Sequence, residues 1–268
     1  MPRFAANLSM MFTEWPFLDR FDAAAQAGFT AVEFLFPYDY APDAIADRLA
    51  RNGLTQALFN LPPGNYAAGE RGLAALPDRF DELRRGVDTA LPYAAATKVK
   101  RVHLMAGLID RGDPKAVAAY RKSIAFAAGR FAAAGIDVLL EPINSRNIPG
   151  YFLNDFAFAE QLIRELALPN VKLQFDIYHC QIIHGDVVMK LRAMLPLIGH
   201  IQIASIPSRN EPDGEELNYP FVFEELDRIG YQGFVGCEYN PRAGTLAGLK
   251  WFEPFAAPGA QRPERGSS

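Results

Sequence analysis

Residues 171–179 read Val-Lys-Leu-Gln-Phe-Asp-Ile-Tyr-His. Apolar and polar side chains alternate from residue 171 to residue 176, which predicts a β-strand with two different faces. The strand ends at Asp176, and we expect a polar, aromatic turn with Tyr178 and His179 to follow it. Because a carboxylate at the end of a buried strand is costly to desolvate, Asp176 should meet a positive charge there.

Three other strands carry an oxygen ligand toward the same end. The preceding strand, Ile-Asp-Val-Leu-Leu-Glu-Pro, ends in Glu141. The following strand, Gly-His-Ile-Gln-Ile-Ala, carries Gln202, and the last strand, Gly-Phe-Val-Gly-Cys-Glu-Tyr, ends in Glu238. Three converging carboxylates would raise one another's pKa unless a cation neutralised them, and oxygen ligands suit Mg²⁺ or Mn²⁺. The pattern therefore predicts a divalent metal site formed by Glu141, Asp176, Gln202 and Glu238.

Strands and helices alternate along the rest of the chain. The other predicted strands cover residues 3–9, 30–36, 54–60 and 99–105. The predicted helices cover residues 17–27, 43–52, a region ending near 96, 114–134, 155–167, 186–196, 220–229 and 246–252. This rhythm predicts one α/β domain, a (β/α)8 TIM barrel over residues 1–255, with its active site at the carboxyl ends of the strands. Residues 256–268 lack a core-forming pattern and are expected to form a mobile tail.

Composition narrows the class of protein. The 268 residues carry a net charge of -4, and 50% of them are hydrophobic, which is ordinary for a globular protein without a basic nucleic-acid surface. The two cysteines are too few for a disulfide framework and indicate a reducing compartment. No secretory leader and no apolar run of membrane-spanning length is evident, so we expect a cytoplasmic protein with no membrane partner.

Several other polar residues have two interpretations. His179 could reach the metal pocket to bind substrate, or it could simply bond to the backbone. Arg209 lies just past Gln202, where its guanidinium could bind a substrate carboxylate, or it could pair with Glu211 or Asp213. Glu33 is interpreted as structural, with an arginine as its expected partner. The loop at residues 61–72 is rich in glycine and proline and long enough to be a lid or a binding loop.

The chain resembles the hydroxypyruvate isomerase family, a branch of the xylose-isomerase-like barrels that includes 2-oxo-tetronate isomerases. The stretches that carry the resemblance span nearly the whole chain: Phe4-Ala-Ala-Asn-Leu-Ser-Met, Val32-Glu-Phe-Leu-Phe-Pro-Tyr, Ala67-Ala-Gly-Glu-Arg-Gly, Glu141-Pro-Ile-Asn, Asp176-Ile-Tyr-His, His200-Ile-Gln-Ile-Ala and Gly236-Cys-Glu-Tyr. One departure concerns the loop after Arg209, where the family more often has glycine at the position of Glu215.

The resemblance implies a metal-dependent isomerase with Glu141 and Glu238 as its acid/base pair. It also implies that Glu141, Asp176, Gln202 and Glu238 hold the metal. The substrate would be hydroxypyruvate, which becomes 2-hydroxy-3-oxopropanoate (tartronate semialdehyde), or a homologue such as 2-oxo-tetronate. The expected partner is a small 2-oxo acid and no nucleic acid, and a homo-oligomer is possible.

Three other functions are compatible with a barrel of this type. A ketose 3-epimerase would act on neutral sugars, but the relatives that epimerise free ketoses usually carry histidine where this chain has Gln202. A repair endonuclease would need several more histidine ligands and a basic face, whereas this chain has four histidines and a net negative charge. A non-catalytic sugar-acid binding protein would have no need for both Glu141 and Glu238.

Overall fold

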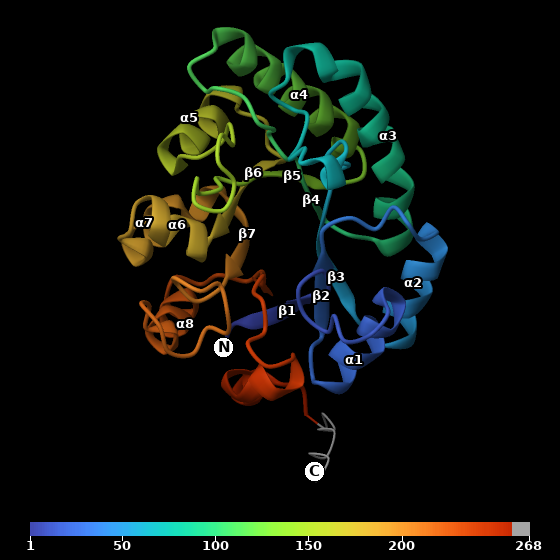
Figure 1. Cartoon of the computed structure of the whole chain (residues 1–268), viewed down its shortest axis with the longest axis vertical. Coiled ribbons are helices and arrows are strands. Elements are labelled where there is room, and N and C mark those ends of the chain that lie inside the picture. Colours follow the sequence, from blue (N-terminus) through green and yellow to red (C-terminus); the bar gives the residue numbers. More distant parts are fainter. Residues whose placement is uncertain (259–268) are drawn as a thin grey trace.

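Eight parallel strands alternate with helices and close into a barrel in the computed structural model (Figure 1). Each strand pairs with its neighbours in the sequence, and β8 pairs with β1. The strands are β1 (Arg3–Asn7), β2 (Ala31–Phe34), β3 (Thr55–Asn60), β4 (Arg101–His103), β5 (Asp137–Leu140), β6 (Val171–Asp176), β7 (Ile198–Ile203) and β8 (Phe234–Cys237). The predicted TIM barrel is therefore confirmed. The structure describes residues 1–258, and residues 259–268 of the predicted tail lie outside the described residues.

Helices surround the barrel on its outer side (Figure 1). The α-helices are α1 (Arg20–Gln26), α2 (Pro42–Arg51), α3 (Phe80–Thr97), α4 (Pro114–Ala132), α5 (Phe156–Leu166), α6 (Ile177–Ile183), α7 (Val187–Met194) and α8 (Tyr219–Arg228). The 3-10 helices are η1 (Phe17–Asp19), η2 (Tyr66–Ala68), η3 (Pro77–Arg79), η4 (Leu195–Leu197) and η5 (Leu246–Phe255). None of the helices within residues 1–258 has the length and apolar character that crossing a bilayer requires.

The prediction of a turn after Asp176 is wrong, because the helix α6 begins there. Asp176 is the N-cap residue of α6, and its side chain accepts a hydrogen bond from the backbone N–H of His179 at 3.2 Å. Such a cap satisfies one of the backbone donors that the first turn of a helix leaves unpaired. The predicted helix at residues 246–252 is likewise a 3-10 helix, which includes Gly248 and Pro254, two residues that disfavour an α-helix.

Strand alternation separates an apolar outer face from an inner face that becomes polar toward one end. On β7, for example, Ile201 and Ile203 belong to the hydrophobic core, whereas His200 and Gln202 make buried polar contacts. On β1, β2 and β3 a small separate cluster consists of Ala5, Ala31 and Ala57. Alternation therefore places His200 and Gln202 on the same face of β7, and Gln202 lies nearer the carboxyl end of that strand.

Candidate active site at the carboxyl ends of the strands

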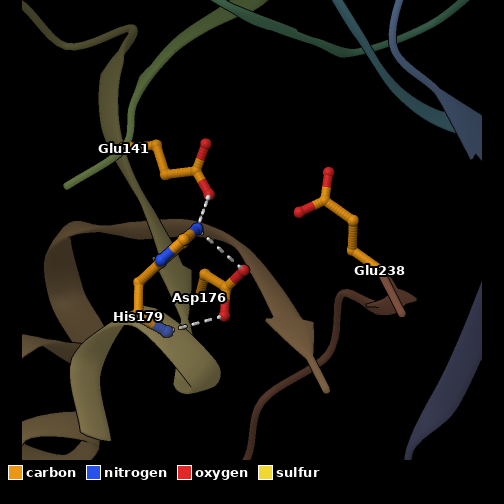
Figure 2. A group of neighbouring side chains, drawn as sticks. All are labelled: Glu141, Asp176, His179 and Glu238. Carbon is orange, nitrogen blue, oxygen red and sulfur yellow. Dashed lines mark hydrogen bonds and ion pairs between the residues drawn. The ribbon is translucent and has the colours of Figure 1, made fainter. Parts of the chain in front are cut away.

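Three carboxylates meet at the carboxyl ends of β5, β6 and β8 (Figure 2). Glu141 directly follows β5, Asp176 is the last residue of β6, and Glu238 directly follows β8. Each of these residues and His179 offers one ligand atom, and the four atoms all lie within 4.8 Å of one another. The structure thus brings together the three carboxylates singled out in the sequence, with His179 beside them.

Burial raises the pKa of each carboxyl group in the cluster, and neighbouring carboxylates add to it. Burial is the main cause of the raised pKa of Glu141, and the charges of Glu238 and Asp176 add to it. Burial also raises the pKa of Asp176 to about 6, although Arg209 and the backbone N–H groups of α6 oppose this shift. For Glu238 burial raises the pKa to about 7 against the opposing charge of Arg209. The site therefore favours a positive charge among these oxygens.

A divalent cation fits the donor set of this cluster. Glu141 Oε1 and Asp176 Oδ2 are buried and have no hydrogen-bond partner among the described residues. Buried carboxylate oxygens without a partner are costly, and hard divalent ions such as Mg²⁺ and Mn²⁺ bind such oxygens. The side chain of Glu238 is 12% exposed, so this side of the cluster is the one open to solvent.

His179 lies on the first turn of α6 and directs its Nε2 atom at two carboxylates (Figure 2). Nε2 lies 3.8 Å from Glu141 Oε1 and 3.8 Å from Asp176 Oδ2. Burial lowers the pKa of His179 well below its usual value, and the charge of Arg209 lowers it further. The imidazole is therefore neutral at physiological pH.

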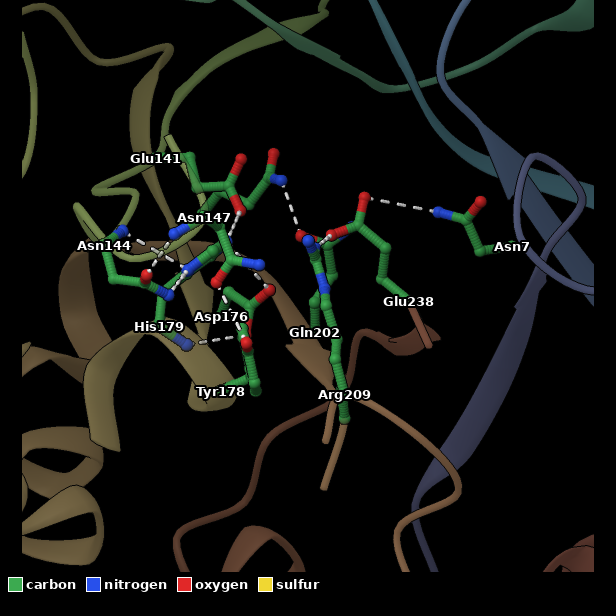
Figure 3. Close-up of polar contacts among 12 residues, drawn as sticks. Asn7, Glu141, Asn144, Asn147, Asp176, Tyr178, His179, Gln202, Arg209 and Glu238 are labelled. Carbon is green, nitrogen blue, oxygen red and sulfur yellow. Dashed lines mark hydrogen bonds and ion pairs between the residues drawn. The ribbon is translucent and has the colours of Figure 1, made fainter. Parts of the chain in front are cut away.

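Arg209 reaches the cluster from the loop that follows β7 (Figure 3). Its Nη2 atom donates to Glu238 Oε2 at 2.6 Å, and its guanidinium lies 5.2 Å from the centre of the Tyr178 ring. Burial opposes the charge on Arg209, but Glu238, Asp176 and Glu141 outweigh burial and raise its pKa. The Nε atom is buried without a hydrogen-bond partner among the described residues, so one guanidinium donor remains free to bind a ligand.

The loop around Arg209 is held by its own hydrogen bonds. Arg209 has a positive φ of 57°, and its N–H donates to the carbonyl of Ser205 while its carbonyl accepts from the N–H of Asn240. Glu211 and Asp213, the alternative partners expected for Arg209, instead pair with Arg242. The guanidinium is therefore directed at the carboxylate cluster rather than at its own loop.

Gln202 lies beside Asp176 in the register of β6 and β7, but its amide is already paired. Its Nε2 atom donates to Glu33 Oε1 at 2.8 Å, and its Oε1 atom accepts from Gln174 Nε2 at 2.6 Å. The assignment of Gln202 as a metal ligand therefore stays a prediction, and binding a metal through Oε1 would replace the bond from Gln174.

Glu33 links several residues beneath the cluster, and its partners are not the arginine expected from the sequence. The carboxylate accepts from His200, Gln202 and Asn7. Asn7 also donates to Glu238 Oε1 at 3.5 Å, so it connects this network to the cluster (Figure 3). Sequence reasoning did not identify Asn7, although its position at the end of the first strand matches that of the acidic residues on the other strands.

His103 also lies beside the carboxylate cluster. It lies on β4, it is 1% exposed, and its Nδ1 atom lies 3.5 Å from Glu141 Oε2. Burial lowers its pKa to about 3, so His103 adds no positive charge to the site at neutral pH.

Comparison with known proteins agrees with this architecture. Residues 21–255 match the family model of the xylose isomerase-like TIM barrel. The 2-oxo-tetronate isomerase of Cupriavidus necator is 56% identical over 257 residues, which cover 95% of this chain and 99% of that relative. The hydroxypyruvate isomerase of Escherichia coli is 42% identical over 257 residues, which cover 95% of this chain and 100% of the relative.

Solved structures give the same fold. The crystal structure of AP endonuclease, family 2 from Brucella melitensis is 51% identical, with a TM-score of 0.94, and covers 96% of this chain and 100% of that chain. D-psicose 3-epimerase from Clostridium cellulolyticum is 19% identical, with a TM-score of 0.74 over 91% of this chain and 87% of that chain, a likeness of fold alone.

The fold and the site together define a (β/α)8 barrel protein with an acidic cluster at the carboxyl ends of its strands. The chain belongs to the xylose isomerase-like TIM barrel family. The resemblance to hydroxypyruvate and 2-oxo-tetronate isomerases is confirmed by relatives that are 40–56% identical, and the predicted isomerase class agrees with them.

Proposed function

We propose that this chain is a metal-dependent isomerase of small 2-oxo acids. It would interconvert a 3-hydroxy-2-oxo acid, hydroxypyruvate or 2-oxo-tetronate, with the isomeric 2-hydroxy-3-oxo acid. The observation that carries the proposal is the convergence of Glu141, Asp176 and Glu238 beside Arg209, whose Nε atom has no partner among the described residues. The 56% identity to a 2-oxo-tetronate isomerase favours the four-carbon acid.

The metal would be held by Glu141, Asp176 and Glu238, with Gln202 as the predicted fourth ligand. The two buried oxygens without partners, Glu141 Oε1 and Asp176 Oδ2, support this assignment. When bound, Mg²⁺ or Mn²⁺ would polarise the substrate carbonyl and stabilise the negative charge of an enediolate.

Glu141 and Glu238 are proposed to move the proton between the two carbons. One carboxylate removes the proton from C3, and the electron pair forms the C2–C3 double bond of the enediolate while O2 takes the charge. The other carboxyl group donates a proton to C2, and a hydroxyl proton passes from O3 to O2. Carboxyl groups with raised pKa values suit both roles near neutral pH, and the sequence of steps conserves all atoms and electrons.

Arg209 is proposed to bind the substrate carboxylate, with His179 as a second substrate contact. A guanidinium matches a carboxylate in geometry as well as charge, and lysine does not reproduce the paired bonds. Arg209 therefore separates 2-oxo acids from neutral ketoses as substrates.

The test compares hydroxypyruvate, 2-oxo-tetronate and a neutral ketose, each with Mn²⁺ and with excess chelator. Wild type should turn over the acids only with metal. We expect Arg209→Lys to raise KM for the acids by about tenfold or more, with a smaller effect on the ketose. Arg242→Lys is the matched control, because Arg242 holds the same loop without contacting the cluster. Equal losses on acid and ketose would mean that Arg209 only supports its loop, and the epimerase alternative would gain.

DNA repair is a second candidate, raised by the similarity to the Brucella structure. The net charge of -4 gives little general attraction for DNA phosphates, and among the described residues only His179 joins the three carboxylates in a group whose ligand atoms lie within 4.8 Å of one another. Nicking of duplex DNA at an abasic site, assayed with Mn²⁺ alongside the acid panel, distinguishes the two. Nicking without isomerisation would reject the isomerase.

We also propose a cytoplasmic location. Cys180 and Cys237 are both free and buried, which agrees with a reducing compartment. Localisation of a tagged protein in its own host would test this, and secretion of the mature protein would contradict it.

A further inference from the structure

The side chain of His179 is held at one ring nitrogen by Asn144, from the loop after β5 (Figure 3). The backbone N–H of Asn144 donates to His179 Nδ1 at 3.3 Å, and Asn144 Nδ2 lies 2.6 Å from the same nitrogen. Both residues are 1% exposed, so solvent does not compete for these contacts. Two nitrogen groups of one residue therefore converge on Nδ1.

The direction of the side-chain bond follows from the backbone. Asn144 Oδ1 accepts the backbone N–H of Asn147 at 2.9 Å, and a backbone N–H can only donate. This contact fixes the oxygen of the Asn144 amide toward residue 147 and leaves the NH₂ group facing the imidazole. His179 Nδ1 thus faces two donors, and a proton on Nδ1 would be directed at both of them.

We propose that Asn144 is a positioning residue that fixes His179 in its Nε2–H tautomer, so that the imidazole acts as a hydrogen-bond donor in the site. An imidazole carries a proton on at least one ring nitrogen, and because Nδ1 accepts from Asn144, that proton lies on Nε2. Nε2 is the atom directed at Glu141 and Asp176 (Figure 2).

The tautomer excludes His179 from the metal ligands, although distance alone groups it with the carboxylates. A nitrogen that carries a proton has no free lone pair for a cation. In the isomerase proposed above, on which this part rests, Nε2–H would instead donate to a substrate oxygen.

The tautomer can be read directly by nitrogen NMR of the metal-free protein, without any activity assay. Only four histidines contribute signals, and the spectrum of His179→Gln identifies those of His179. Wild type should show the proton on Nε2. Asn144→Asp keeps an oxygen for the N–H of residue 147 but turns a second oxygen toward Nδ1, so the proton should move to Nδ1. Asn144→Ala keeps the backbone donor and should keep the Nε2–H tautomer.

Kinetics and metal binding complete the test. Asn144→Asp should lower kcat/KM about tenfold to a hundredfold, because His179 Nε2 would then carry a lone pair in place of its proton. Asn144→Ala should lower kcat/KM less. His179→Gln should retain Mn²⁺ affinity within about threefold, whereas Asp176→Asn should weaken it by more than tenfold. A wild-type proton on Nδ1, an unchanged tautomer in Asn144→Asp, or equal Mn²⁺ losses in the two variants would overturn the inference. Inactivity of wild type on every 2-oxo acid, with the tautomer as expected, would reject the proposed function instead.

Discussion

Replacing Glu33 with glutamine tests how the network beneath the site is held together. The Glu33 carboxylate is buried and accepts from His200 Nε2 at 2.6 Å. It also accepts from Gln202 Nε2 at 2.8 Å and from Asn7 Nδ2 at 3.0 Å, both at the same oxygen, Oε1. A Cβ atom at Gly236 would lie 2.2 Å from the other oxygen, so the barrel leaves room for this carboxylate and little more.

The substitution Glu33→Gln keeps the shape of the side chain but turns one acceptor oxygen into a donor. In one orientation the remaining oxygen of the new glutamine accepts from Gln202 and Asn7, and its NH₂ group faces the Nε2–H group of His200. In the other orientation the oxygen accepts from His200, and the NH₂ group faces the NH₂ groups of Gln202 and Asn7. In either orientation at least one buried donor loses its acceptor, which costs about 1–3 kcal/mol, and the surviving bonds lose their charged partner. We expect the free energy of unfolding to fall by about 2–5 kcal/mol. This is a large part of the total, since the free energy of unfolding of a folded protein is usually about 5–15 kcal/mol.

Urea unfolding of the chelator-treated protein at pH 7 measures this loss without a contribution from bound metal. Glu160→Gln is the control, since among residues 1–258 Glu160 pairs only with Arg164 on the exposed face of α5, and it should leave the unfolding midpoint unchanged within error. A loss of less than about 1 kcal/mol for Glu33→Gln would refute the reasoning, because an unpaired buried donor cannot be that inexpensive.

Two further predictions concern the carboxylate cluster. Glu141→Gln and Glu238→Gln should each lower kcat about a hundredfold or more while leaving the circular dichroism spectrum unchanged, and near-normal kcat in either variant would remove that residue from the proton-transfer steps. The contribution of Asp176 and Glu238 to the stability of the metal-free protein should fall as pH rises from about 4 to about 7, whereas the lowered pKa values of His103 and His179 act in the opposite direction. Burial raises the folded-state pKa of Asp176 to about 6 and of Glu238 to about 7 from model values of 3.8 and 4.5, so these two groups bind more protons in the folded protein than in the unfolded chain in this range. Urea unfolding of wild type and of Glu238→Gln in chelator across this pH range isolates the Glu238 contribution, and Mn²⁺ should add most stability to wild type at the upper end. A wild-type stability that does not fall relative to that of Glu238→Gln as pH rises would contradict the prediction.

The strands and the acidic cluster could be predicted because both depend on short-range patterns. Alternating side chains that stop at Glu141, Asp176 and Glu238 predict where each strand ends, and the parallel barrel brings those ends to one edge. The helix α6 was missed for an equally local reason. The segment after Asp176 is short and aromatic, and its helix depends on a cap that the same carboxylate provides while it faces the site.

The partners of the buried polar groups could not be predicted, because they come from distant parts of the chain. Glu33 and Gln202 are 169 residues apart in sequence, and they meet only because the barrel closes. The orientation of an amide depends on which of its neighbours can donate and which can accept. Gln202 could therefore be identified from the sequence as an oxygen-bearing residue near the site, but the sequence does not reveal that its NH₂ group faces Glu33 and its oxygen faces Gln174.

Glu215 shows how a departure from a family pattern can support the site. Glycine is favoured where the backbone adopts a positive φ, and Glu215 is not among the described residues that do so. The Glu215 carboxylate accepts the backbone N–H of Ser208 at 3.1 Å and also the Ser208 hydroxyl, directly before Arg209. The Glu215 side chain therefore ties the residue before Arg209 to the other end of the loop from which Arg209 reaches Glu238.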